Sequence, residues 1–191
     1  MKITLVRHTE VDERYHKKYN GHIDIGLSLR GVNQAKELAA FFQTHQFDLV
    51  YCSDLKRARD TLKPFKQENK ATYTELLREK SWGKHEGLSF DEIIAQGEIE
   101  YKDFLQWINA LDGEEYELYI SRVKKFFIEY LSRLDVENIL VVTHGGIIRV
   151  LIAIVKQLSL QEAFSLNVPY SAYTIFDTDS MSFSEVKYNF S

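Results

Sequence analysis

Three apolar, strand-like runs of the chain each lead into side chains that could bind an anion. The runs are residues 3–6, 49–52 and 139–142. The side chains that follow them are Arg7 and His8, Arg57, and His144. In open α/β sheets, ligands bind outside the carboxyl ends of the strands, so these side chains are expected to meet. Two arginines and two histidines make a cationic pocket, and a phosphoryl group is the anion that best fits it.

The chemistry expected of this pocket is phosphoryl transfer through a histidine. A neutral imidazole is a competent nucleophile toward phosphorus, and nearby arginines favour the neutral form of His8 by like-charge repulsion. Attack by His8 would form a phosphohistidine and divide the reaction into two in-line displacements. Arg7 and Arg57 would bind the equatorial phosphoryl oxygens. His144 would donate a further hydrogen bond beside the helix that starts at Gly145.

The pocket also needs a proton donor for the leaving oxygen, and Glu79 is the expected one. Glu79 follows the strand-like residues 71–74 and should therefore lie at the same edge of the sheet. It would protonate the leaving group and then, as a carboxylate, activate water against the phosphohistidine.

The composition indicates one acidic globular domain over residues 1–191. The net charge of −4 argues against nucleic-acid or anionic-membrane partners, and 45% hydrophobic residues suffice for one core. The single cysteine, Cys52, excludes an internal disulfide framework and fits a reducing compartment. The chain begins on a strand pattern, and its longest apolar stretch, residues 147–155, is too short to span a bilayer. We therefore expect a cytoplasmic protein without a membrane span, and we leave a homodimer open.

Strand and helix patterns alternate along the chain, which is typical of an α/β fold. Strands are expected at residues 2–6, 49–52, 71–74 and 139–142, with a hairpin of residues 173–177 and 181–188. Helices are expected after a cap at Ser28, after a cap at Ser53 or Asp54, at 116–134, at 145–158, and after a capping box of Ser159 and Glu162. The first helix should bury a face made of Leu29, Val32, Ala35, Leu38, Ala39 and Phe42.

This order of elements predicts a three-layer sandwich, in which helices cover both faces of a mainly parallel central sheet. Pro64 should end or kink the helix after the second strand. Residues 80–113 are the irregular part of the chain. They are expected to form short helices that act as a lid over the C-terminal ends of the strands.

Segments along nearly the whole chain resemble, in order, the motifs of the histidine phosphatase superfamily, which has the phosphoglycerate mutase-like fold. The matching segments are residues 5–10, 21–31, 53–61, 77–89 and 142–149. The resemblance implies the roles given above: His8 as nucleophile, Glu79 as proton donor, and Arg7, Arg57 and His144 as the phosphate pocket. It also implies that no metal or organic cofactor takes part.

Departures from the family pattern bear on the substrate. Thr9 stands where the signature usually has glycine, and Arg-His-Thr-Glu-Val resembles the branch that includes α-ribazole phosphatases. Arg14 stands where many members carry a substrate-contacting asparagine. It would either favour a more anionic substrate or simply point to solvent. Thr9, Arg14 and Gly145 complete the set of residues expected to contact substrate.

The segment between Glu79 and His144 is shorter than in the glycolytic mutases of the family. A mutase must keep its phosphoenzyme away from water, and a shorter lid makes hydrolysis easier. We therefore expect a metal-independent phosphoric monoester hydrolase of the histidine acid phosphatase type. Its substrate would be a small phosphorylated metabolite, and α-ribazole 5′-phosphate is one candidate. Mutase-type phosphoryl transfer is the alternative.

Two other classes of protein are open to test. A cysteine-dependent phosphatase would need arginine six positions after Cys52, where Ala58 stands, so Cys52→Ser should leave activity intact. A non-catalytic module that binds phosphorylated ligands would not hydrolyse p-nitrophenyl phosphate, and an activity lost in His8→Ala would exclude it. The remaining histidines lack metal-ligand spacing, so no metal site is expected: His16, His22, His45 and His85.

Overall fold

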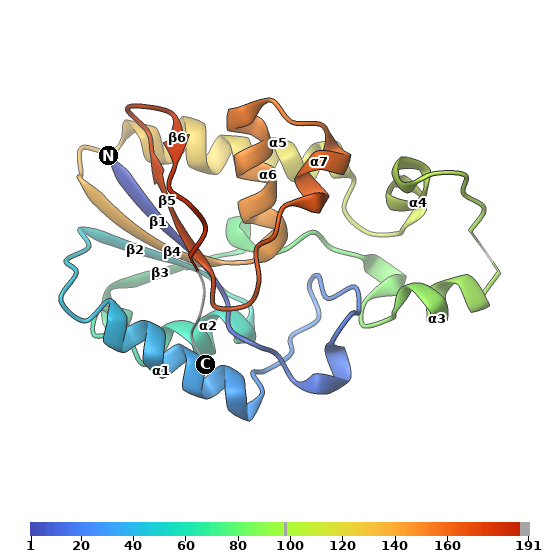
Figure 1. Ribbon diagram of the computed structural model, residues 1–191, viewed down its shortest axis with the longest axis horizontal. Helices are drawn as coiled ribbons and strands as arrows, with labels where there is room; N and C mark the ends of the chain where they lie inside the picture. The colour runs from blue at the N-terminus through green and yellow to red at the C-terminus, as the bar shows by residue number, and fades with distance from the viewer. Residues whose placement is uncertain (98, 188–191) are drawn as a thin grey trace.

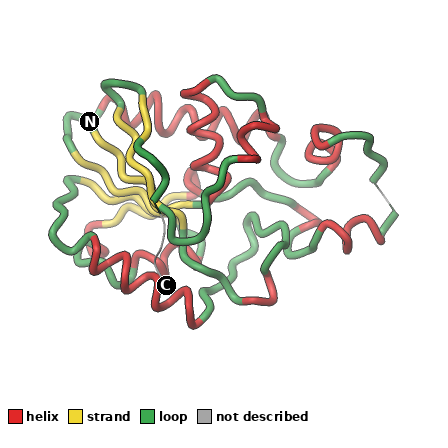
Figure 2. Tube along the Cα trace, viewed as in Figure 1, coloured by secondary structure: helices red, strands yellow, loops and turns green. Residues whose placement is uncertain are grey.

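A mainly parallel six-stranded sheet forms the centre of the computed structural model, which describes residues 1–97 and 99–187 (Figure 1 and Figure 2). The strand order is β3-β2-β4-β1-β5-β6. The strands are β1 Lys2–Arg7, β2 Leu49–Ser53, β3 Ala71–Thr74, β4 Asn138–Thr143, β5 Tyr173–Asp177 and β6 Ser182–Phe183. The first four are parallel, whereas β5 runs antiparallel to β1, and β6 to β5. The predicted hairpin ends at Tyr188, which lies outside the described residues.

Two apolar layers flank this sheet and confirm the predicted sandwich. Alternate residues of a strand point to opposite faces, so Leu5 packs in one apolar cluster and Val6 in the other. Helices α5 (Tyr116–Lys124) and α6 (Gly145–Lys156) cover the Leu5 face. Helices α1 (Leu29–Phe41) and α2 (Lys56–Leu62) cover the Val6 face, as Figure 1 shows. Burial on both faces explains why the parallel strands are nearly continuous apolar runs.

Helix α1 begins where predicted, and it buries Ala35, Leu38 and Phe42 of the predicted face but not its first turn. The Ser28 side chain accepts a hydrogen bond from the Gly31 amide, as an N-cap should. The prediction for Leu29 and Val32 is wrong, because they are 88% and 41% exposed. A Cβ on Gly31 would lie 2.0 Å from the Glu10 carbonyl oxygen, so the helix contacts the loop after β1 through its smallest residue. The buried residues of α1 are Gly31, Gln34, Ala35 and Leu38.

The other helices confirm most of the predicted boundaries. The cap of α2 is Leu55 rather than Ser53 or Asp54, and the helix ends two residues before Pro64. Helix α7, Leu160–Ser165, starts with the predicted capping box. The predicted helix 116–134 is α-helical only through Lys124 and continues as a π-helical turn, Lys125–Tyr130, and a 3-10 turn, Leu131–Arg133.

Residues 80–97 and 99–113 form a separate small lobe beyond the carboxyl ends of the strands (Figure 1). It contains α3, Phe90–Ala95, and α4, Phe104–Ala110. An apolar cluster of its own holds the lobe together, made of Trp82, Ile93, Trp107, Ile108 and Leu111. Its function as a lid stays a prediction. None of the helices in the described part of the chain is long and apolar enough to cross a membrane.

Candidate active site

His8 follows β1 and is oriented by its own backbone. Its Nδ1 lies 2.8 Å from the Thr9 carbonyl oxygen, which can only accept, so Nδ1 carries the proton of a neutral ring. Nε2 then has a free lone pair in the pocket that His8 lines. Burial, followed by the charges of Arg57 and Arg7, holds the pKa of His8 well below its usual value. The imidazole is therefore neutral at physiological pH.

Arg7 is fixed at the end of β1 by two contacts. Its Nη1 donates to the Val168 carbonyl oxygen at 2.6 Å, and its guanidinium lies 4.1 Å from the centre of the Tyr170 ring. Burial lowers the pKa of Arg7 to about 10, which leaves it charged at neutral pH. Both contacts come from the segment between α7 and β5, so this loop sets the direction of the guanidinium.

Arg57 projects from α2 and is 1% exposed. Its Nη1 donates to Ile23 O at 2.9 Å, while its Nη2 donates to Gly21 O at 2.6 Å and Asn20 O at 3.2 Å. Three carbonyl acceptors fix the plane of the guanidinium, and two of its five N–H groups remain for a ligand. The loop of residues 20–23 therefore positions Arg57.

His144 follows β4 and lies against His8, with ring centroids 5.2 Å apart. Its Nε2 is 2.8 Å from the Ser53 hydroxyl, and its buried Nδ1 has no partner among the described residues. Burial and then the Arg57 charge hold the pKa of His144 well below its usual value. A neutral His144 that accepts from Ser53 can donate from Nδ1.

The Glu79 carboxylate lies at the start of α6. Tyr119 O–H donates to Oε1 at 2.5 Å, and the amides of Gly146 and Lys80 donate to Oε2 at 2.8 Å and Oε1 at 3.1 Å. Gly146 belongs to the first turn of α6, where free amides and the helix dipole favour a negative charge. Glu79 is thus held in one orientation from three sides.

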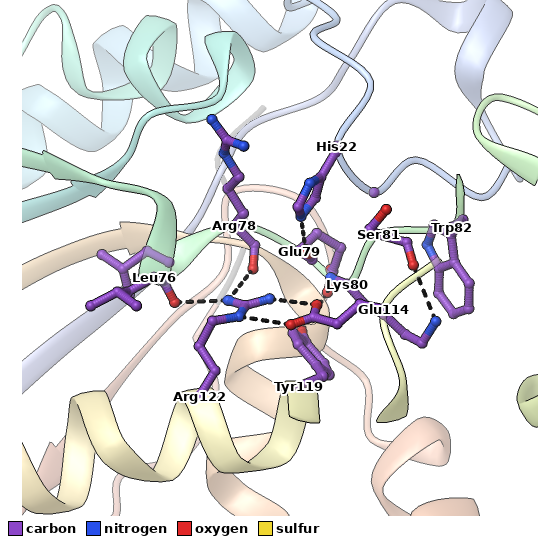
Figure 3. Close-up of polar contacts among 12 residues, drawn as sticks. His22, Leu76, Arg78, Glu79, Lys80, Ser81, Trp82, Glu114, Tyr119 and Arg122 are labelled. Atoms are coloured by element: carbon purple, nitrogen blue, oxygen red, sulfur yellow. Dashed lines mark hydrogen bonds and ion pairs between the residues drawn. The ribbon is translucent and has the colours of Figure 1, made fainter. Parts of the chain in front are cut away.

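Arg122 of α5 braces the backbone that carries Glu79 (Figure 3). It donates to the carbonyl oxygens of Leu76 at 2.8 Å and Arg78 at 2.9 Å, and it pairs with Glu114 at 2.7 Å. From the opposite side, the His22 ring lies 3.1 Å from the Glu79 carbonyl oxygen. These positioning residues were absent from the sequence predictions.

Glu86 joins the two loops that frame the pocket. Its carboxylate accepts hydrogen bonds from four main-chain amides, those of Gly21, His22, Ile23 and Trp82. One carboxylate therefore links the loop that holds Arg57 to the loop that follows Glu79. Glu86 lies in the segment that resembles the family's acid-bearing motif, but sequence reasoning gave it no role.

The structure brings Arg7, His8, Arg57 and Glu79 into one cavity of about 210 Å³, with His144 against His8. Other lining residues were not predicted from sequence. They include Lys18, Tyr19, Asn20, Lys80, Trp82, Tyr116, Arg149, Phe164 and Tyr170. The lining of the cavity thus combines cationic and aromatic side chains. The catalytic roles of the five predicted residues stay predictions, which the experiments below test.

Three residues expected to contact substrate lie elsewhere. Thr9 is fully buried, and its amide and hydroxyl bond the Thr61 hydroxyl at 3.0 Å and 3.2 Å. Arg14 is not among the described residues that line the cavity: its guanidinium pairs with Asp12, and its side chain is 80% exposed. Asp12 can pair with Arg14 because it stands two residues before it, at the start of the 3-10 turn Glu13–Tyr15. Gly145 lies next to the Arg7 side chain and is not among the lining residues. Its neighbour Gly146 lines the cavity instead.

Cys52 lies apart from this chemistry. It is fully buried in the apolar cluster under α1 and α2, and its Sγ donates to Ser53 O at 3.2 Å. Burial raises the pKa of the thiol well above its usual value. A buried, protonated thiol is a poor nucleophile, which argues against a cysteine-dependent phosphatase.

Gly146→Ala tests the placement of Glu79. A Cβ at position 146 would lie 2.1 Å from Glu79 Oε1, so the carboxylate must move. We expect kcat/KM to fall about 100-fold, since a 1 Å misplacement costs about that much. The control is Gly26→Ala, whose Cβ would meet the flexible Lys56 side chain at 3.3 Å and Asp60 Oδ2 at an ordinary contact distance of 3.9 Å. Equal activity of the two variants would contradict the placement.

The fold and the site together define a family. A sequence model of the Histidine phosphatase superfamily (branch 1) matches residues 3–191, so the chain belongs to that superfamily and is a phosphatase. It is 26% identical to the adenosylcobalamin/alpha-ribazole phosphatase of Escherichia coli over 182 residues, 93% of this chain and 90% of that protein. It is 31% identical to a broad-specificity phosphatase of Saccharomyces cerevisiae over 191 residues, 93% of this chain and 79% of that protein.

The solved structure of Bacillus stearothermophilus YhfR superposes with a TM-score of 0.82 at 26% identity, covering 96% of this chain and 94% of that one. The predicted phosphoglycerate mutase-like architecture is thereby confirmed.

Proposed function

We propose that the protein hydrolyses small phosphomonoesters through a phosphohistidine on His8, without a metal. The observation that carries the proposal is the hydrogen bond between His8 Nδ1 and Thr9 O. It leaves Nε2 unprotonated, with its lone pair available in a cationic cavity. Among the described residues, no group of three or more metal-binding side chains gathers. The proposed chemistry therefore depends on arginines and imidazoles.

In the first displacement, His8 Nε2 forms a bond to phosphorus as the ester oxygen leaves. Arg7 and Arg57 offset the charge of the equatorial oxygens, and each such preorganised donor contributes on the order of 3–4 kcal/mol to the lowered barrier. His144 Nδ1 donates to the same oxygens, which would satisfy this otherwise unpartnered buried group. Glu79, in its acid form, gives its proton to the leaving oxygen.

In the second displacement, water attacks the phosphohistidine. Glu79, now a carboxylate, takes a proton from the water as the P–N bond breaks. Inorganic phosphate leaves, and His8 regains its neutral form with Glu79 protonated. The hydrogen bonds from Tyr119 and Gly146 hold the Glu79 carboxylate in place for this step.

The substrate is a small phosphorylated metabolite, and α-ribazole 5′-phosphate is one candidate because a phosphatase whose name includes it is among the relatives. Aromatic residues on the cavity walls could contact an apolar leaving group. Phosphate release should be measured across a panel of metabolite monophosphates. The alternative, a mutase, predicts that 3-phosphoglycerate is isomerised rather than hydrolysed when a bisphosphorylated primer is present.

The proposal requires His8 and His144 to stay neutral in mildly acidic solution. Their pKa values lie well below the usual 6.5, because burial and the arginines disfavour imidazolium. Below about pH 6.5 these two imidazoles would be protonated in the unfolded chain but not in the folded one. The free energy of unfolding should therefore decrease as the pH falls through that value. NMR of ¹⁵N-labelled imidazoles should show both rings neutral at about pH 6. Midpoints at or above 6.5 would contradict this electrostatic account.

A further inference from the structure

The cavity carries more positive charge than one phosphoryl group requires. Its described lining includes five cations but one carboxylate, Glu79. The cations are Arg7, Lys18, Arg57, Lys80 and Arg149. A phosphomonoester dianion offsets only part of this charge. Like charges in a partly enclosed site repel one another, so the surplus indicates a ligand with a second anionic group.

The two lysines are already engaged at the edge of the cavity. Lys18 pairs with Glu92 of α3 at 3.2 Å. Lys80 donates to Ser81 O at 3.1 Å, and its ammonium lies 4.2 Å from the centre of the Trp82 ring. Lys18 is thus tied to the small lobe, and Lys80 makes its contacts inside that lobe.

Arg149 has free donors on its guanidinium. Its Nε donates to Leu166 O at 2.9 Å, which fixes the direction of the planar fork. Within residues 1–97 and 99–187, neither Nη atom of Arg149 has a hydrogen bond or an ion pair. The side chain is half-buried and lines the cavity. It is thus a preorganised anion-binding group that the hydrolytic mechanism does not use.

Arg149 lies close to the phosphoryl site. It follows Gly145 by four residues in α6, so the two share a face of the helix. A Cβ on Gly145 would lie 3.2 Å from Arg149 Nη1 and 3.2 Å from Arg7 Nε. Both guanidiniums therefore lie next to Gly145. An anion on Arg149 thus needs only a short spacer to reach a phosphoryl group on Arg7.

We propose that Arg149 binds a substrate carboxylate next to the phosphoryl group and makes the enzyme selective for small phosphorylated acids. This proposal rests on the proposed phosphomonoesterase function and names a determinant of its specificity. It ranks phosphorylated acids above α-ribazole 5′-phosphate, which carries no carboxylate. A carboxylate is planar and matches the guanidinium fork through two parallel hydrogen bonds.

Two substrates that differ at one position test the proposal. 3-Phosphoglycerate carries a carboxylate where glycerol 3-phosphate carries a hydroxymethyl group. Phosphate release should show a wild-type kcat/KM at least about tenfold higher for 3-phosphoglycerate, as expected for a charged hydrogen-bonded pair. In Arg149→Met, the ratio should fall to about one. Arg149→Lys should retain part of the preference, since it keeps the charge without the fork.

The control is Lys156→Met, which removes one charge from the exposed end of the same helix and should keep the wild-type ratio. Because each ratio is measured within one variant, a loss of folded protein cancels. A wild-type ratio near one, or an equal loss for both substrates in Arg149→Met, would overturn the proposal. Failure of the wild type to hydrolyse p-nitrophenyl phosphate would instead overturn the proposed function itself.

Discussion

His8→Ala is expected to lower kcat for p-nitrophenyl phosphate by about 10⁴- to 10⁶-fold, the range seen when a nucleophile is removed. The arginines would still bind the phosphoryl group, so KM should change much less than kcat. Among the described residues that line this cavity, His8 is the only histidine. The loss should therefore affect every phosphomonoester alike, as measured by steady-state release of p-nitrophenol and of phosphate.

Cys52→Ser is the matched control for that variant, because it changes another buried nucleophile while leaving the cavity intact. Its kcat should stay within about threefold of the wild type, a range set by surrounding packing. Retention of activity in His8→Ala together with its loss in Cys52→Ser would reverse the assignment of the nucleophile.

Glu79→Gln is expected to slow the two half-reactions unequally. Ester oxygens that are poor leaving groups need a proton, so hydrolysis of glycerol 3-phosphate should fall by about 10²- to 10⁴-fold. p-Nitrophenolate leaves without protonation, so phosphorylation of His8 by p-nitrophenyl phosphate should persist. Attack of water on the phosphohistidine would then be slow. Rapid mixing should show a burst of one p-nitrophenol per enzyme, followed by slow turnover.

Glu75→Gln controls for a charge change on the same segment, since Glu75 is exposed and pairs with Arg78 at the surface. It should show no burst and a nearly normal rate. Equal losses for both substrates in Glu79→Gln, without a burst, would indicate that Glu79 shapes the pocket rather than moving a proton.

The central elements were predictable because burial leaves a clear trace in the sequence. A strand such as β4 is apolar at successive positions, and the rule for carboxyl ends then places Arg7, His8 and His144 together. Arg57 was found in the same way, through β2. Local sequence pattern and strand topology were sufficient to predict that these residues meet.

The supporting residues were not predictable by that route. Tyr119 lies within the predicted helix 116–134, to which sequence reasoning gave no part in the site, yet its hydroxyl donates to Glu79. Glu86 acts through amides of a loop whose path depends on contacts distant in sequence. Arg149 is the one charged residue in the apolar stretch 147–155, and a charge at such a position was the available signal that it has a function. Of the two alternatives given for Arg14, the structure favours the one in which it points to solvent, because its guanidinium pairs with Asp12.

Trapping the phosphoenzyme tests the central claim most directly. Glu79→Gln would be mixed with ³²P-labelled p-nitrophenyl phosphate, quenched within milliseconds, digested under alkaline conditions and sequenced by mass spectrometry. We predict one phosphoryl group per chain, stable to base, labile to acid and located on His8. An acid-stable label, or a label on any residue other than His8, would contradict the account.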